Sequence, residues 1–121
     1  MGPDRGALLG HDYWLVLSTP APGTTAADLE RHLDAHLAWL LDLEADGVAF
    51  LSGPLTSGPG VAPGSGVTVL RAADAGAAAT IAAGDPFVTA GLRTAEVFGW
   101  RLNEGAISLR VSLGTGSYTW G

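Results

Sequence analysis

The order of strand-like and helix-like segments is the feature that most constrains the fold of this 121-residue chain. Apolar or alternating runs predict strands, and amphipathic or small-residue runs after capping signals predict helices. The predicted elements are a strand at 12–18, a helix at 26–45, strands at 48–51 and 67–71, a helix at 73–83, and strands at 93–102 and 106–113. Up to residue 102 this order is the split β-α-β pattern of a ferredoxin-like α+β domain, with both helices on one face of an antiparallel sheet.

The ends of these elements carry clear local signals. Thr25, with Asp28 three residues later, predicts a capping box at the start of the long helix, and Gly47 predicts its end. The Gly- and Pro-rich run 53–66 predicts a surface loop, because it lacks the spacing of a phosphate-binding loop. We expect residues 1–11 to be a flexible leader and residues 12–121 a single domain.

The C-terminal part predicts an extension of the basic pattern. In the run 106–113, Ile107, Leu109, Val111 and Leu113 alternate with polar residues, as in a half-exposed strand. We expect this run to belong to a C-terminal hairpin extension, with 118–120 as a short tail.

Composition narrows the classes of partner. The chain carries 12 acidic and 6 basic residues, so it lacks the positive field by which proteins hold nucleic acid. It contains no cysteine, which excludes disulfide and thiolate chemistry. It has no apolar run of the roughly 18 residues that a membrane span needs. The first ten residues lack the apolar core of a signal peptide. We expect a cytoplasmic protein that binds neither nucleic acid nor membrane.

The predicted sheet has more apolar surface than two short helices can cover. The runs 12–18, 48–51 and 67–71 are all strongly apolar. A second copy of the sheet is the usual cover for such a face. The sequence therefore predicts a homodimer in which two sheets face each other.

A histidine lies in the apolar stripe of the long helix. Leu29, Leu33, His36 and Leu40 recur at helical spacing, so they share the face that looks toward the core or a pocket. A histidine on such a face needs a hydrogen-bond partner. Asp85, in the run Asp85-Pro86-Phe87, is the candidate partner, because an aspartate fixes the imidazole tautomer.

Several short motifs together resemble one protein family. They are His32–Leu37, Leu43–Gly47, Leu51–Leu55, Asp85-Pro86-Phe87, Ala90-Gly91 and Glu96. In this order the set resembles the YCII-related family over about residues 13–105. The resemblance implies a ferredoxin-like domain that dimerises into an α/β barrel, with an active site that pairs His36 with Asp85. One branch of the family is similar to a dehydrochlorinase of a chlorinated hydroxyquinol. Leu33 stands where many members carry an arginine.

Two classes of function follow. A His–Asp pair can act as a general acid and base. Since no serine or cysteine nucleophile motif occurs, we expect elimination, isomerisation or tautomerisation of a small organic molecule by a cofactor-independent lyase or isomerase. The alternative is a non-catalytic dimer of the same fold that binds a small molecule or acts as a scaffold. An open cleft beside His36 favours the enzyme, and a collapsed cleft favours the alternative. Asp85 can also cap a helix before Pro86, and both roles can hold together.

Other residues are candidates for substrate binding. The predicted set is His32, Tyr13, Trp39, Gly53, Pro54 and Phe87. Core or interface packing is the competing interpretation of Tyr13 and Trp39. His32 and His36 have the spacing of two metal ligands, with Asp85 as a candidate third. The glutamate that follows the first histidine in zinc hydrolases is Leu33 here, so we predict no metal site.

Overall fold

The computed structural model describes residues 2–121, which fall into two compact units. Asp12–Arg101 form the larger unit, and Leu102–Gly121 group with the residues up to His11 in the smaller one. Residue 1 of the predicted leader lies outside the described residues, and Arg5–Ala7 form a short 3-10 helix. The assignment of residues 12–121 to a single domain stays a prediction.

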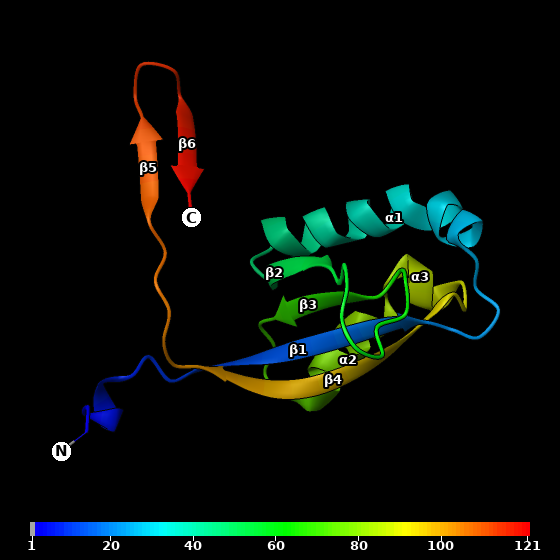
Figure 1. Ribbon diagram of the computed structural model, residues 1–121, viewed down its shortest axis with the longest axis horizontal. Coiled ribbons are helices and arrows are strands. Elements are labelled where there is room, and N and C mark those ends of the chain that lie inside the picture. The colour runs from blue at the N-terminus through cyan, green and yellow to red at the C-terminus, as the bar shows by residue number, and fades with distance from the viewer. Residues whose placement is uncertain (1) are drawn as a thin grey trace. The chain divides into compact units, whose positions relative to one another are not determined.

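The larger unit contains every element of the predicted ferredoxin-like pattern (Figure 1). Its elements are β1 (His11–Pro20), α1 (Ala26–Ala45), β2 (Ala49–Pro54), β3 (Gly66–Leu70), α2 (Ala75–Ala83), α3 (Pro86–Thr89) and β4 (Arg93–Leu102). The short helix α3 follows α2 directly and begins at the predicted Asp85-Pro86 signal. None of the helices among the described residues combines the length and hydrophobicity needed to cross a membrane. The cytoplasmic location stays a prediction.

The strands of the larger unit form one sheet in the order β2-β3-β1-β4 (Figure 1). β3 pairs antiparallel with both neighbours, and Val69 of β3 lies between Leu15 of β1 and Leu51 of β2. Each helical crossover leaves one strand between the two strands that it connects, which is the split β-α-β arrangement. The predicted ferredoxin-like α+β fold is therefore confirmed.

The core lies between the sheet and the helices. Val16 of β1, Leu70 of β3 and Ala82 of α2 form its buried centre, and Leu43 of α1 packs against them. Both helices therefore cover the same face of the sheet, as predicted. Because side chains alternate along a strand, residues adjacent to this core set, such as Leu15, face the other side.

The first helix begins and ends at the predicted signals. The Thr25 hydroxyl accepts a hydrogen bond from the Asp28 backbone N–H at 3.1 Å. The Asp28 carboxylate accepts one from the Thr25 backbone N–H at 2.9 Å, which completes the capping box. Gly47 adopts a φ of 72° after the C-cap, a conformation that glycine reaches without a side-chain clash. These local bonds hold the helix that carries His36.

The smaller unit contains a two-stranded antiparallel hairpin, β5 (Leu109–Ser112) and β6 (Ser117–Trp120). The predicted hairpin extension is confirmed, but residues 118–120 are a strand and not a tail, because they pair with β5. The strand predicted at 106–113 is shorter than expected, and its apolar side is not buried: Ile107 is 70% and Leu113 is 93% exposed. A two-stranded sheet by itself buries little apolar surface.

Candidate active site

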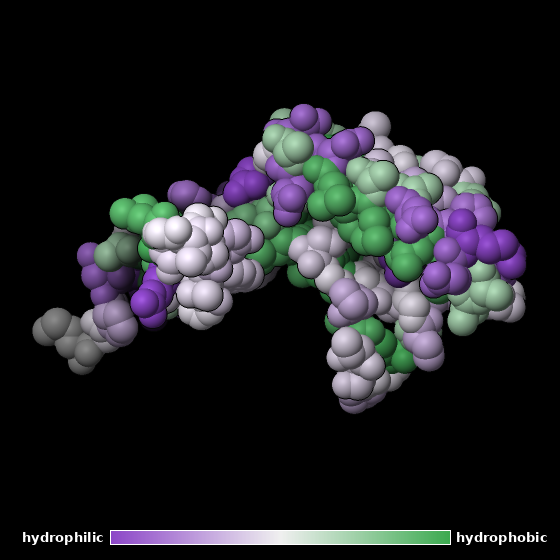
Figure 2. Space-filling model, turned by 90° about the horizontal axis from the view of Figure 1, so that it is seen from above, coloured by the Kyte–Doolittle hydropathy of each residue, from purple (hydrophilic) through white to green (hydrophobic). Residues whose placement is uncertain are grey.

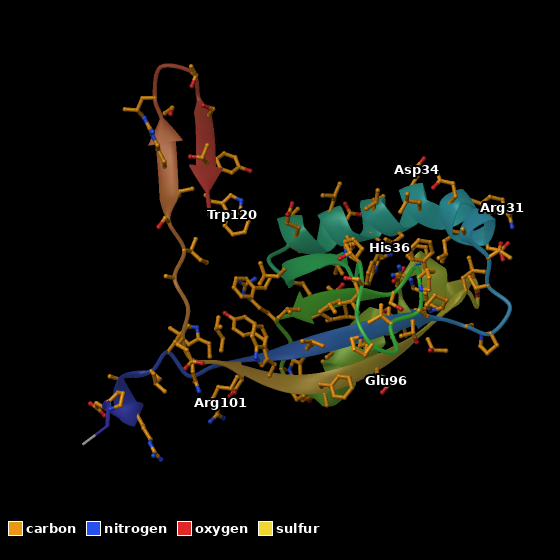
Figure 3. All side chains as sticks on the ribbon, in the orientation of Figure 1. Arg31, Asp34, His36, Glu96, Arg101 and Trp120 are labelled. Atoms are coloured by element: carbon orange, nitrogen blue, oxygen red, sulfur yellow. The ribbon has the colours of Figure 1, made fainter. Side chains whose placement is uncertain are left out.

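His36 is the buried residue of α1, with 8% of its surface exposed. Its ring points from the helix toward the sheet, whereas Arg31 and Asp34 on the same helix point away (Figure 3). Its Nδ1 lies 2.7 Å from Oδ1 of Asp85. The predicted hydrogen bond between these two residues is therefore confirmed, although they are 49 positions apart in the chain.

Asp85 makes this bond from the position directly before the helix α3. It is the N-cap of α3, and Pro86 occupies the first helical turn. The same Oδ1 atom also accepts the backbone N–H of Phe87 at 2.9 Å. Asp85 is only 3% exposed, so its carboxylate is fixed by two bonds within the protein. The capping role and the pairing role hold together.

This geometry determines which nitrogen of His36 can meet a ligand. A carboxylate accepts hydrogen bonds, so Nδ1 of His36 donates and carries the proton. In the neutral ring, Nε2 is then the atom with a free lone pair. A second contact fixes the plane of the ring: it stacks on Phe87 with a centroid distance of 4.3 Å. The imidazole is oriented before any ligand arrives.

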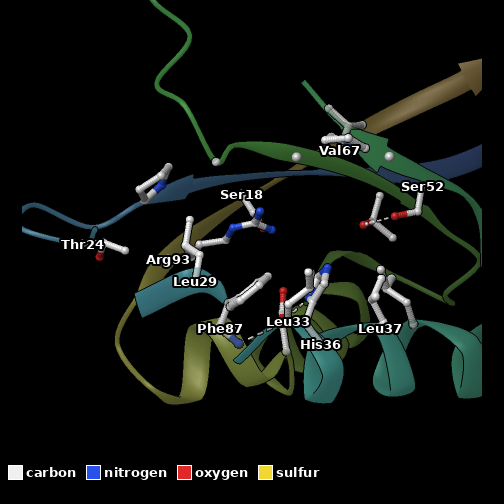
Figure 4. A pocket seen from close by; sticks show the side chains of 18 of the residues that line it. Ser18, Thr24, Leu29, Leu33, His36, Leu37, Ser52, Val67, Phe87 and Arg93 are labelled. Carbon is white, nitrogen blue, oxygen red and sulfur yellow. Dashed lines mark hydrogen bonds and ion pairs between the residues drawn. The ribbon is translucent and has the colours of Figure 1, made fainter. Parts of the chain in front are cut away.

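His36 and Asp85 both line a cleft of about 1070 Å³ between α1 and the sheet (Figure 4). The predicted apolar stripe of α1 forms one wall, and the facing strands add hydroxyls such as Ser18 and Thr68. Leu37 and Leu41 of α1, which line the cleft, are 44% and 60% exposed. Figure 2 shows hydrophobic side chains at the surface between hydrophilic ones. The cleft is open and mostly apolar, as small-molecule sites usually are.

The predicted substrate-binding residues divide into two groups. Gly53, Pro54 and Phe87 line the cleft. The other three, His32, Tyr13 and Trp39, are not among the described residues that line the cleft. Tyr13 lies on the sheet face away from the helices, where it stacks on Phe50 at 4.8 Å. Trp39 follows His36 on α1, with its ring 6.0 Å from the His36 ring, and the competing interpretation of packing fits it.

His32 is bound to its own helix. Its Nδ1 lies 3.1 Å from the backbone oxygen of Asp28, one turn earlier. His36, the other histidine at this spacing, uses its Nδ1 for the bond with Asp85. Within residues 2–121 there is no group of three histidine, cysteine, aspartate or glutamate side chains arranged to hold a metal ion.

The sequence-based reasoning missed Arg93, which also lines the cleft. Its guanidinium lies over the Phe87 ring, with Cζ 4.5 Å from the centroid. Burial lowers the pKa of Arg93, and the nearby Asp85 carboxylate opposes that shift. A signal was present: Arg93 alternates with Ala95 and Val97, which pack on the core, so it had to face the helices.

Two of three comparisons with known proteins found similar proteins. Residues 13–101 match the protein family described as YCII-related domain. The fold is similar to 5-chloro-2-hydroxyhydroquinone dehydrochlorinase (TftG) from Burkholderia phenoliruptrix, solved in complex with 2,5-dihydroxybenzoquinone. That similarity has a TM-score of 0.57 and 25% identity, and covers 77% of this chain and 95% of the other. A comparison with curated protein sequences found no match.

Proposed function

Because this chain belongs to the YCII-related family, we propose that it is a small enzyme that transfers protons on a small organic molecule. His36 acts as the general acid and base, and Asp85 orients it. One observation carries the proposal: the 2.7 Å bond between His36 Nδ1 and Asp85 Oδ1 at the wall of an open cleft. Among the reactions that a His–Asp pair can run alone are elimination, isomerisation and tautomerisation.

The proposed steps use only these side chains. Nε2 of His36 takes a proton from a C–H or O–H group of the substrate. The electron pair left behind forms a double bond, and in an elimination the leaving group departs from the neighbouring atom with its own electron pair. The ring is then an imidazolium, which the Asp85 carboxylate stabilises through Nδ1–H. In an isomerisation, the same Nε2–H returns the proton to another atom of the substrate.

The alternative, a non-catalytic binding or scaffolding dimer, is less well supported. A binding role needs no polarised histidine, whereas here Asp85 engages the ring and Phe87 fixes its plane. The cleft is open and not collapsed. The similar solved structure is named as a dehydrochlorinase, which is a lyase-type activity. These observations favour the enzyme.

We also propose that two copies associate through the sheet face that the helices leave uncovered. Leu51, Phe98 and Trp100 alternate with core-facing residues on this face, and they are 45%, 47% and 37% exposed. These exposed apolar side chains lie on the two edge strands of the sheet, β2 and β4, and exposed apolar surface of this kind marks an association surface. Two sheets meeting here would give the homodimer that the apolar strands predict.

Release of chloride from 5-chloro-2-hydroxyhydroquinone is the first assay of the enzymatic proposal, since this compound is named for the similar structure. Replacing His36 by Gln should lower kcat by about 10² to 10⁴, because general acid-base catalysis contributes that much. His11→Gln is the matched control, because His11 is exposed at the start of β1. If His36→Gln turns over any substrate as fast as the wild type, the proposal is refuted.

A further inference from the structure

We propose that Arg93 makes the cleft a site for small apolar molecules that carry an anionic oxygen group, a carboxylate or a phenolate. In this arrangement the anion pairs with the guanidinium while the reacting part of the molecule meets Nε2 of His36. The catalytic part of this statement rests on the proposed function, whereas the anion site stands on the geometry of Arg93.

The guanidinium is held in place but left without a hydrogen-bond acceptor. Its Nε atom is buried without a hydrogen-bond partner among residues 2–121, and no hydrogen bond joins its other nitrogens to a described residue. The Phe87 ring lies on one side of it. The backbone of Gly66 lies close by, since a Cβ on Gly66 would be only 3.5 Å from Nη1. The guanidinium that lines the cleft therefore has donors that no acceptor of the described residues satisfies, and a ligand with an acceptor can bind the Nη nitrogens.

The position of Arg93 relative to His36 is also specific. Phe87 contacts both residues: the His36 ring is 4.3 Å and the Arg93 Cζ 4.5 Å from its centroid. Figure 4 shows the Arg93 side chain on the sheet side of Phe87 and the His36 ring beside it. A planar molecule of modest size can therefore reach both groups from the same cleft. The leucines of α1 supply the apolar contact for the rest of it.

The charges around the cleft make Arg93 the group that selects an anion. It is the permanently cationic side chain among the described residues that line the cleft. The Asp85 carboxylate interacts electrostatically with Arg93, but its Oδ1 atom already accepts hydrogen bonds from His36 and Phe87. Glu30 and Glu44 also line the cleft but are exposed, where water and salt screen their charge. Guanidinium nitrogens bind a carboxylate or phenolate strongly in such a setting.

The test compares pairs of probes that differ in charge and hardly in shape. Binding of benzoate and benzamide, and of 4-nitrophenolate and 4-nitroanisole, is measured by isothermal titration calorimetry with the full chain. The wild type should bind the anionic member of at least one pair about tenfold or more tightly, since charge-assisted bonds contribute that much. The pair with the larger ratio identifies whether a carboxylate or a phenolate is preferred.

Variants assign the preference to Arg93. Arg93→Gln should reduce the ratio to about one, and Arg93→Lys should retain part of it. Arg101→Gln is the matched control, because Arg101 is an exposed arginine of the same strand, paired with Asp12. Circular dichroism checks that each variant is folded. If Arg93→Gln does not fold, the comparison of wild type with Arg93→Lys is the test. A ratio that is high in the wild type and lower in Arg93→Lys supports the inference, and an equal ratio in both overturns it.

The outcomes separate this inference from the proposed function. Equal binding of the charged and neutral probes by the wild type overturns it, and so does a ratio that persists in folded Arg93→Gln. His36→Gln should keep the ratio while it loses turnover in the chloride-release assay. A preference for anionic probes without any turnover would support the Arg93 anion site and count against the proposed enzyme. Turnover without such a preference would support the enzyme and overturn the anion site.

Discussion

Replacing Asp85 by alanine removes two interactions at once, and their cost can be worked out separately. Loss of the N-cap bond to Phe87 costs about 1 kcal/mol of unfolding free energy. The Nδ1–H of His36 is also left buried without an acceptor, which costs about 1–3 kcal/mol more. We therefore expect Asp85→Ala to lower the unfolding free energy by about 2–4 kcal/mol.

The chain offers a matched control for the capping part of this cost. Asp74 is the N-cap of α2, and its carboxylate accepts the Ala77 backbone N–H at 2.8 Å. Asp74 is exposed and has no histidine partner. Asp74→Ala should therefore cost only about 1 kcal/mol. The difference between the two alanine variants measures the contribution of the buried bond to His36.

Asp85→Asn separates charge from shape. Asparagine caps helices about as well as aspartate, and its amide oxygen can still accept from Nδ1–H of His36. We expect this variant to lose about 1 kcal/mol, because a neutral bond replaces a charge-assisted one. Turnover should fall by a much larger factor than this loss of stability corresponds to, because the imidazolium that forms during the reaction then lacks its counter-charge.

Urea unfolding followed by circular dichroism gives the free energies, and nitrogen NMR of the rings gives the tautomer of His36. If Asp85→Ala costs no more than Asp74→Ala, the bond between His36 and Asp85 contributes nothing to the folded state. If NMR places the proton of the neutral His36 ring on Nε2 and not on Nδ1, the proposed assignment of the basic nitrogen is wrong.

Three further predictions concern other parts of the molecule. Hydrogen bonds from Thr25, the N-cap residue of α1, lower the pKa of Asp28. The stability that the Asp28 charge provides is therefore present above the usual aspartate pKa and is lost in acid. In urea unfolding, the free energy that Asp28→Asn loses relative to the wild type should accordingly be smaller at about pH 3 than at neutral pH. Gly64→Ala should lower the unfolding free energy by about 1–3 kcal/mol, since Gly64 has a φ of 91° and the new Cβ would lie 2.5 Å from Leu29 Cδ1. Gly60 also has a positive φ, but a Cβ there would lie in open space, so Gly60→Ala should lower the unfolding free energy by less in the same assay. Phe98→Glu on the uncovered sheet face should yield a monomer by light scattering, and a wild type that is itself monomeric at micromolar concentration would contradict the proposed dimer.

Local signals in the sequence were enough to predict the elements and several of their ends. Thr25 and Asp28 form the predicted capping box, Gly47 follows the end of α1, and Asp85 caps the short helix that begins at Pro86. Each of these bonds joins residues within four positions of one another, so the neighbouring residues decide them. The same holds for the side of α1 that His36 occupies, because helical spacing alone places it with the leucines.

Contacts between elements depended on the tertiary structure. The residues by themselves made Asp85 the candidate partner of His36, and the family resemblance implied the same pair. Only the tertiary structure brings the two side chains, 49 positions apart in the chain, to 2.7 Å. Tyr13 was a candidate for the pocket, but its strand register directs it to the other face of the sheet. Arg93 belongs to no motif. It reaches the cleft because β4 lies beside β1 in the sheet and because the Phe87 ring packs against its guanidinium. Such contacts are decided by strand pairing and packing between segments far apart in the chain, which no local pattern of residues encodes.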